Sequence, residues 1–81
     1  PQYPRPAQEQ KLSGWTIVML LVDEQGKVLE TAPVESSEAF MDYDKGVAEE
    51  LRGSTFTPGK LDGRAVKTMM FVTVRFDPAG L

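Results

Sequence analysis

Residues 14–34, GWTIVMLLVDEQGKVLETAPV, decide the fold of this chain. Val, Ile and Trp are concentrated in residues 14–22, which is typical of a β-strand. Asp23 to Gly26 predicts a four-residue turn, because aspartate side chains bond nearby backbone and glycine can adopt positive φ. Residues 27–34 then return as a second strand, so the stretch predicts a β-hairpin. Pro33 has no amide hydrogen, which places this second strand at a sheet edge or at a bulge.

The length and composition are those of one small soluble domain. The chain has 81 residues, of which 41% are hydrophobic and 26% charged, which is ordinary for a globular domain. Its longest apolar run, residues 17–22, is far shorter than the roughly 18 residues of a membrane helix. The first residue is Pro1 rather than Met, and we expect the chain to be a fragment of a longer protein.

Charge and residue usage exclude most chemistry. The formal net charge is −3, and the chain has neither His nor Cys. Disulfides, thiolate or imidazole metal ligands and His-based triads are therefore excluded. The basic footprint of a nucleic-acid binder is also absent. We expect no catalytic residue, no metal, no cofactor and no nucleic-acid partner.

The remaining polar groups form weak sites at best. Acidic pairs follow the turns and one face of a predicted helix, and Ser36 and Ser37 have no His to activate them. The acids near glycines at Asp23 and Asp62 lack the spacing of a calcium loop. Residues 59–63 lack the Gly-Lys-Ser/Thr ending of a phosphate loop. Solvated faces, turns and helix caps account for these residues.

Two helices and a third strand complete the predicted elements. The Pro-rich opening is extended, and Pro6 begins a short helix through residues 7–12. Residues 38–52 predict one helix, with Ser36–Ser37 or Asp42 as the N-cap and Gly53 as the stop signal. We expect Gly46 to allow this helix to approach the sheet closely. Residues 54–65 predict a loop, and residues 66–76 alternate as a strand.

These elements predict an α+β fold in the order short α-β-β-α-β. The smallest arrangement that buries the helix is a two-layer domain, with a three-stranded antiparallel sheet and the helix on one face. One domain covers residues 1–81: an extended segment and short helix (1–13), a ββαβ core (14–76) and a tail (77–81). The predicted core consists of the helix residues Phe40, Tyr43, Val47 and Leu51 and the strand residues Thr16, Val18, Leu20, Val22, Val66, Thr68, Met70, Val72, Val74 and Phe76.

The opposite face of the sheet is predicted to be apolar and open. It would present Trp15, Ile17, Met19 and Leu21 from the first strand, with Met69 and Phe71 beside them. Either the chain ends or a dimer partner cover this face, or it is a docking surface for another protein.

The last strand is the best candidate binding element. An edge strand has unpaired backbone groups to which an extended peptide can add. Residues 30–50 hold seven acids and one base, whereas residues 52–75 hold five bases and one acid. Bases flanking the last strand, Arg64, Lys67 and Arg75, would select an acidic peptide. Alternatively, the chain's own tail or a second copy covers this edge, and the domain is an assembly module.

Motifs along residues 1–76 resemble the TonB C-terminal domain. They are Pro1-Gln2-Tyr3-Pro4, Ala7-Gln8, Gly14, Val22-Asp23, Gly26-Lys27-Val28, Val34-Glu35-Ser36-Ser37 with Phe40 and Asp42, Phe56-Thr57-Pro58, Asp62-Gly63, Val66 and Phe71 to Phe76. A TolA-like C-terminal domain is a related interpretation, although TolA domains usually carry a disulfide.

The resemblance implies a periplasmic domain of an inner-membrane-anchored energy transducer. Such a domain binds the TonB box of outer-membrane receptors, a short extended segment that often begins with an acid, in parallel with its last strand. The receptors import iron–siderophore complexes, haem or cobalamin, and ExbB- and ExbD-type motor proteins contact the N-terminal part of the transducer. The residues implicated in partner binding are Gln2, Tyr3, Pro4, Val66, Thr68, Met69, Met70, Phe71, Val72, Thr73 and Val74, to which the charge pattern adds Arg64 and Lys67.

Overall fold

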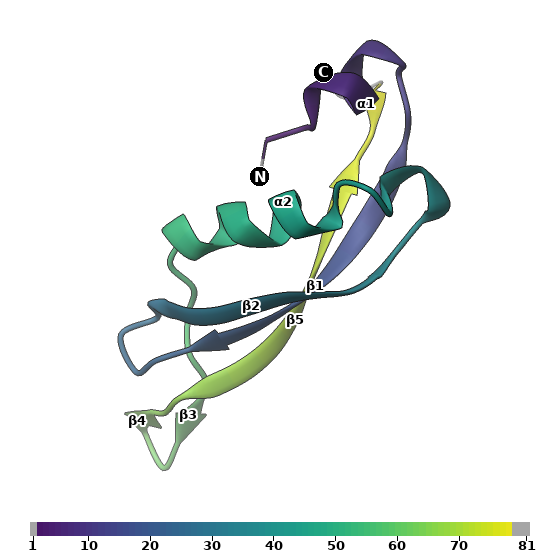
Figure 1. Ribbon diagram of the computed structural model, residues 1–81. Coiled ribbons are helices and arrows are strands. Elements are labelled where there is room, and N and C mark those ends of the chain that lie inside the picture. Colours follow the sequence, from purple (N-terminus) through teal and green to yellow (C-terminus); the bar gives the residue numbers. More distant parts are fainter. Residues whose placement is uncertain (1, 79–81) are drawn as a thin grey trace.

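The computed structural model describes residues 2–78 and has an α+β fold (Figure 1). A three-stranded antiparallel sheet has the order β2 (Val28–Ser36), β1 (Gly14–Val22), β5 (Thr68–Phe76), and the helical segment covers one of its faces. The predicted fold class is confirmed. The elements are α1 (Arg5–Glu9), β1 (Gly14–Val22), β2 (Val28–Ser36), η1 (Glu38–Phe40), α2 (Asp44–Glu50), η2 (Leu51–Gly53), β3 (Lys60–Leu61), β4 (Arg64–Ala65) and β5 (Thr68–Phe76).

The hairpin of β1 and β2 forms as its residues predict. The Oδ1 atom of Asp23 accepts hydrogen bonds of 2.9 Å from the backbone N–H groups of both Gln25 and Lys27. Gly26 has a φ of 83° and lies against the backbone carbonyl of Phe56, where a Cβ atom would overlap it. This turn therefore requires glycine both for its conformation and for its close contact.

The edge position of β2 explains Pro33. Pro33 lies opposite Val18, and the register shifts at this point so that Val34 has no partner on β1. This bulge at the sheet edge confirms both placements that the missing amide hydrogen predicted.

The prediction of one helix over residues 38–52 is wrong. The segment consists of the 3-10 turn η1, a further turn, the short α2 and the 3-10 turn η2. Neither Ser37 nor Asp42 caps α2, which begins after Tyr43 without a side-chain cap. The hydroxyl oxygen of Ser37 instead accepts a 3.0 Å bond from the backbone N–H of Trp15, so it joins the segment to β1.

The buried face of this segment is nonetheless the predicted one. Phe40, Val47 and Leu51 are buried, and Tyr43 packs against them. Apart from its own helix backbone and chain neighbours, Gly46 has no atom within 4 Å of the position that a Cβ would occupy. The expectation that Gly46 permits close contact with the sheet is therefore also wrong.

Three other boundaries differ from prediction. The first helix covers Arg5–Glu9 rather than residues 6–12, and β2 covers Val28–Ser36 rather than 27–34. The last strand begins at Thr68 rather than Val66, because the preceding residues form the small hairpin of β3 and β4. Asp62 and Gly63, with φ of 51° and 79°, make the tight turn of that hairpin.

Aromatic residues fix the N-terminal segment onto the end of the sheet. The ring of Tyr3 lies edge-on to the rings of Phe40 and Phe76, at centroid distances of 6.0 and 5.0 Å. Phe40 and Phe76 are stacked at 4.8 Å. Residues 2–9 therefore belong to the packed domain and lie beside the C-terminal end of β5 (Figure 1).

Candidate peptide-binding edge

The outer edge of β5 is unpaired in the part of the chain that the structure describes. β5 bonds to β1 on one side, and no strand within residues 2–78 lies on its other side. The strand has nine residues without Pro or a register shift. It therefore presents a regular row of backbone donors and acceptors to a further strand.

The register identifies which backbone groups point outward. The N–H of Trp15 bonds to the Ser37 side chain and its carbonyl to the Ser37 N–H, so Trp15 points toward β2. Backbone direction alternates along a strand. Thr16, Val18, Leu20 and Val22 therefore point toward β5, where they pair with Val74, Val72, Met70 and Thr68.

It follows that the intervening residues of β5 have outward backbone groups. These residues are Met69, Phe71, Thr73 and Arg75. Of the predicted partner-binding residues, only Met69, Phe71 and Thr73 thus offer free backbone groups on the outer edge. Thr68, Met70, Val72 and Val74 use theirs in the ladder with β1.

The backbone groups of Val66 are also hydrogen-bonded within the domain. Its N–H donates a 3.0 Å bond to the carbonyl of Gly59, and its carbonyl accepts a 2.7 Å bond from the Thr68 hydroxyl. The same hydroxyl oxygen accepts a 2.7 Å bond from the N–H of Gly59. These contacts close the loop before β5, and they shorten the available edge to a start at Met69.

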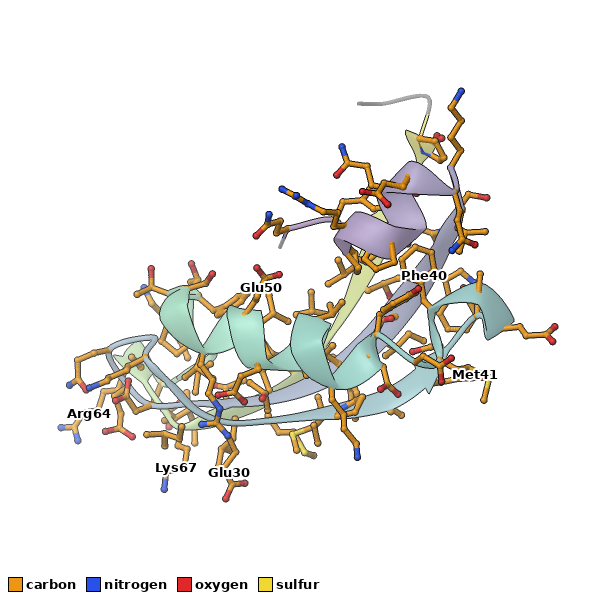
Figure 2. All side chains as sticks on the ribbon, turned by 45° about the horizontal axis from the view of Figure 1, so that its top comes forward. Glu30, Phe40, Met41, Glu50, Arg64 and Lys67 are labelled. Carbon is orange, nitrogen blue, oxygen red and sulfur yellow. The ribbon has the colours of Figure 1, made fainter. Side chains whose placement is uncertain are left out.

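Two bases stand at the beginning of this edge. Arg64 lies in β4 and Lys67 directly precedes β5; both are exposed, and neither makes an ion pair with another described residue. Figure 2 shows the Lys67 side chain on the side of the sheet away from α2. An acidic group beside the first residues of β5 would meet positive charge without competition from an internal partner.

The predicted residues of the N-terminal segment lie at the other end of β5. Gln2 is exposed, Pro4 is half-buried, and Tyr3 is only 9% exposed because its ring is part of the core. The structure therefore does not bring Gln2, Tyr3 and Pro4 together with Arg64 and Lys67 (Figure 1). A partner could reach both clusters only by following the whole length of β5.

A groove separates the N-terminal segment from α2. It has a volume of about 380 Å³, and its lining includes Gln2, Pro4, Asp42 and Glu50. The backbone N–H of Gln2 donates a 2.8 Å bond to the Glu50 carboxylate, across 48 positions of sequence. No local pattern signals such a distant contact, and the sequence did not indicate Asp42 or Glu50 as site residues.

Burial changes the ionisation of one aromatic residue. Desolvation raises the pKa of the Tyr3 hydroxyl above its ordinary value, and the negative charge of Asp77 raises it further. The Tyr3 hydroxyl has no hydrogen-bond partner among the described residues. Within residues 2–78 no three acidic side chains are grouped as metal ligands would be, and no helix has the length and apolar character needed to cross a bilayer.

A family model for the C-terminal region of the Gram-negative bacterial TonB protein matches residues 1–78. The chain belongs to this family. A comparison with curated proteins gave no match. The TonB C-terminal family is a family of energy transduction and transport rather than of enzymes, and its domain is periplasmic and interacts with outer-membrane receptors in general. The unpaired β5 edge of this TonB domain is therefore the first place to seek a receptor segment.

Proposed function

We propose that this TonB domain binds the TonB box of an outer-membrane receptor as an added strand on the outer edge of β5. The domain then transmits a pull to the receptor, which imports an iron–siderophore complex, haem or cobalamin. The observation that supports this proposal is the regular, unpaired edge that begins at Met69. Backbone hydrogen bonds give such a complex its affinity, and side chains beside the edge select the peptide.

The outward backbone groups of Met69, Phe71 and Thr73 form the grip. Each hydrogen bond contributes only about 1 kcal/mol net, because the peptide exchanges bonds to water for bonds to the strand. A row of such bonds shares a load applied along the strand, and the complex still dissociates when the load ends. A transducer that acts in repeated cycles needs this combination.

Charge favours a parallel orientation of the box. In that orientation the beginning of the peptide lies beside the beginning of β5, where Arg64 and Lys67 are exposed. An acidic first residue, which the family resemblance implies, then meets these two bases. In the antiparallel orientation the same acid would lie near Arg75 and Asp77, which carry opposite charges, whereas the beginning of β5 has two bases.

The N-terminal segment would provide a second contact beyond the end of the box. Gln2 and Pro4 flank Tyr3, whose ring contacts Phe76 at the C-terminal end of β5, so a receptor surface that continues beyond the box can reach this segment. Tyr3 acts differently, because its buried ring holds this segment against Phe40 and Phe76. The family resemblance implies a transducer that is anchored in the inner membrane and contacts ExbB- and ExbD-type motor proteins, and we assign neither role to the residues of β5 or of the N-terminal segment.

Proline substitution tests the grip directly. Phe71→Pro removes one outward N–H while leaving the ladder with β1 intact, whereas Phe71→Ala shortens the side chain and keeps the N–H. We expect Phe71→Pro to weaken binding of an acidic box peptide by at least tenfold in calorimetry, since proline also disturbs the neighbouring bonds. We expect Phe71→Ala to weaken it much less.

Folding of both variants is checked by far-UV circular dichroism. Val72→Pro serves as the contrast, because it removes a bond to β1 and should destabilise the domain itself. If folded Phe71→Pro binds the peptide as tightly as the unmodified domain, strand addition at this edge is refuted.

A further inference from the structure

The face of the sheet away from α2 is apolar and only partly buried: its β1 residues are half-buried and its β5 residues are exposed. It presents Trp15, Ile17, Met19 and Leu21 along β1, with Met69 and Phe71 beside them on β5. Met69 and Phe71 are 62% and 61% exposed. We call these six residues the open face. Their positions confirm the predicted alternation, and an exposed apolar patch of this kind indicates a binding surface.

The two borders of the open face carry opposite charges. On β2, the residues opposite Leu21 and Ile17 are Glu30 and Glu35. On the other side, Arg75 lies opposite Trp15 and Lys67 precedes β5. Figure 2 shows Glu30 and Lys67 both pointing away from α2, and no ion pair joins them within the chain.

We propose that the open face pairs with the open face of a second copy of this chain, about a two-fold axis parallel to β1. This axis reverses the order of the strands but keeps their direction. The acidic β2 border of each copy therefore lies over the basic β5 border of the other. Glu30 then lies over Met69 of the second copy, two residues along the chain from its Lys67. Glu35 lies over its Thr73, two residues from its Arg75, and each pair of opposite charges occurs twice.

Side-chain size supports the same axis. Met19 lies opposite Ala32 on β2 and opposite Phe71 on β5. Rotation about β1 therefore seats the large exposed ring of Phe71 over the small Ala32 of the second copy. A two-fold axis perpendicular to the strands would instead place Phe71 over Phe71 and acid over acid. Parallel strands in the two facing sheets also agree with the aligned packing of β-sandwiches.

The dimer leaves both β5 edges accessible and is expected to be weak. A three-stranded face nine residues long measures about 30 by 14 Å, or about 400 Å² per copy. The total is below the roughly 1,200 Å² of a standard stable interface, which is typical of a transient complex. We therefore expect monomers at about 10 μM and mainly dimers at about 1 mM.

Sedimentation equilibrium across this concentration range tests the proposal. Met19→Glu places two negative charges together at the axis and should give a monomer throughout, whereas Lys45→Glu, on α2, should dimerise like the unmodified chain. A monomer at about 1 mM for the unmodified chain would overturn the proposal, and so would a Met19→Glu variant that dimerises normally.

Charge reversal tests the orientation of the two copies. Recovery of association in a mixture of two variants could not result from unfolding of either variant. Glu30→Lys and Lys67→Glu should each weaken self-association by about tenfold, because each variant places like charges at both pairs. A mixture of the two variants should form heterodimers, in which both pairs are again of opposite sign. If the mixture associates no better than either variant alone, the proposed axis is wrong.

Discussion

At the scale of single residues, Tyr3 shows how a residue of a binding motif can have a structural role. Its ring contacts Phe40 and Phe76, while its hydroxyl is buried without a hydrogen-bond partner among the described residues. A buried hydroxyl without a partner contributes little or costs stability. Tyr3→Phe should therefore be as stable as the unmodified domain, or slightly more stable, at neutral pH in urea unfolding.

The raised pKa of Tyr3 gives this comparison a pH dependence. The folded state favours the neutral hydroxyl of Tyr3. The resulting contribution to the free energy of unfolding is fully present below pH 10 and is lost as pH rises through the folded-state pKa. The unmodified domain should lose stability relative to Tyr3→Phe above that pH. Unfolding curves of the two proteins that keep a constant separation between pH 7 and about 11 would contradict this assignment.

Lys67 and Arg75 form a matched pair for the charge of the binding edge. Both are exposed bases, one before the first residue of β5 and one near its last. Lys67→Gln should weaken binding of a peptide that begins with Asp by about two- to fivefold, and Arg75→Gln should have a smaller effect. Equal effects, or a larger effect of Arg75→Gln, would argue for the antiparallel orientation.

At the scale of elements, substitutions at Gly14 and Gly46 distinguish the effect of side-chain packing on stability from the effect of helix propensity. A Cβ at Gly14 would overlap the Ser37 hydroxyl and the Phe40 ring, whereas one at Gly46 would meet open space. Gly14→Ala should destabilise the domain by about 1–3 kcal/mol. Gly46→Ala should stabilise it by up to about 1 kcal/mol, because alanine favours the helix interior.

Thermal or urea unfolding of the two variants checks this contrast. Destabilisation by Gly46→Ala would mean that α2 needs the glycine for a contact that the packing does not show. An unchanged stability of Gly14→Ala would mean that Ser37 and Phe40 move aside at little cost.

The elements also show which features can be predicted from sequence. The two faces of β1 and β5 follow from alternation, because a period of two fixes the face of every residue once one face is buried. The broken helical segment could not be predicted in the same way. The 3-10 turns η1 and η2 keep Phe40 and Leu51 on the same face as α2, so the apolar spacing resembles that of one helix.

Long-range contacts explain the remaining differences. Ser37 is of a residue type that often caps helices, but its hydroxyl bonds to the backbone of Trp15. This contact depends on tertiary structure and not on the local sequence. β5 begins later than the alternation predicts, because the residues before it form the β3–β4 hairpin and the Val66 N–H bonds to the carbonyl of Gly59. The bond between Gln2 and Glu50, and the groove beside it, likewise have no local signal.

At the scale of the whole molecule, β5 connects the two parts of the candidate site. The molecule is elongated, at 47 × 21 × 17 Å, with Lys67 at one end of β5 and the N-terminal segment at the other. An added strand along β5 would therefore run from the exposed bases toward the N-terminal segment. Because the outer edge and the open face are different surfaces of the sheet, an added strand and a second copy can be bound together. Lys67 borders both surfaces, so the acid of the box and Glu30 of the second copy would compete for its charge.

Amide hydrogen exchange with and without an acidic box peptide tests strand addition most directly. Free in solution, the domain should exchange the outward amides of Met69, Phe71 and Thr73 quickly and the inward amides of Met70, Val72 and Val74 slowly, because only the latter bond to β1. Saturating peptide should slow the outward set by at least about tenfold. Outward amides that exchange equally fast with and without bound peptide would contradict strand addition at β5.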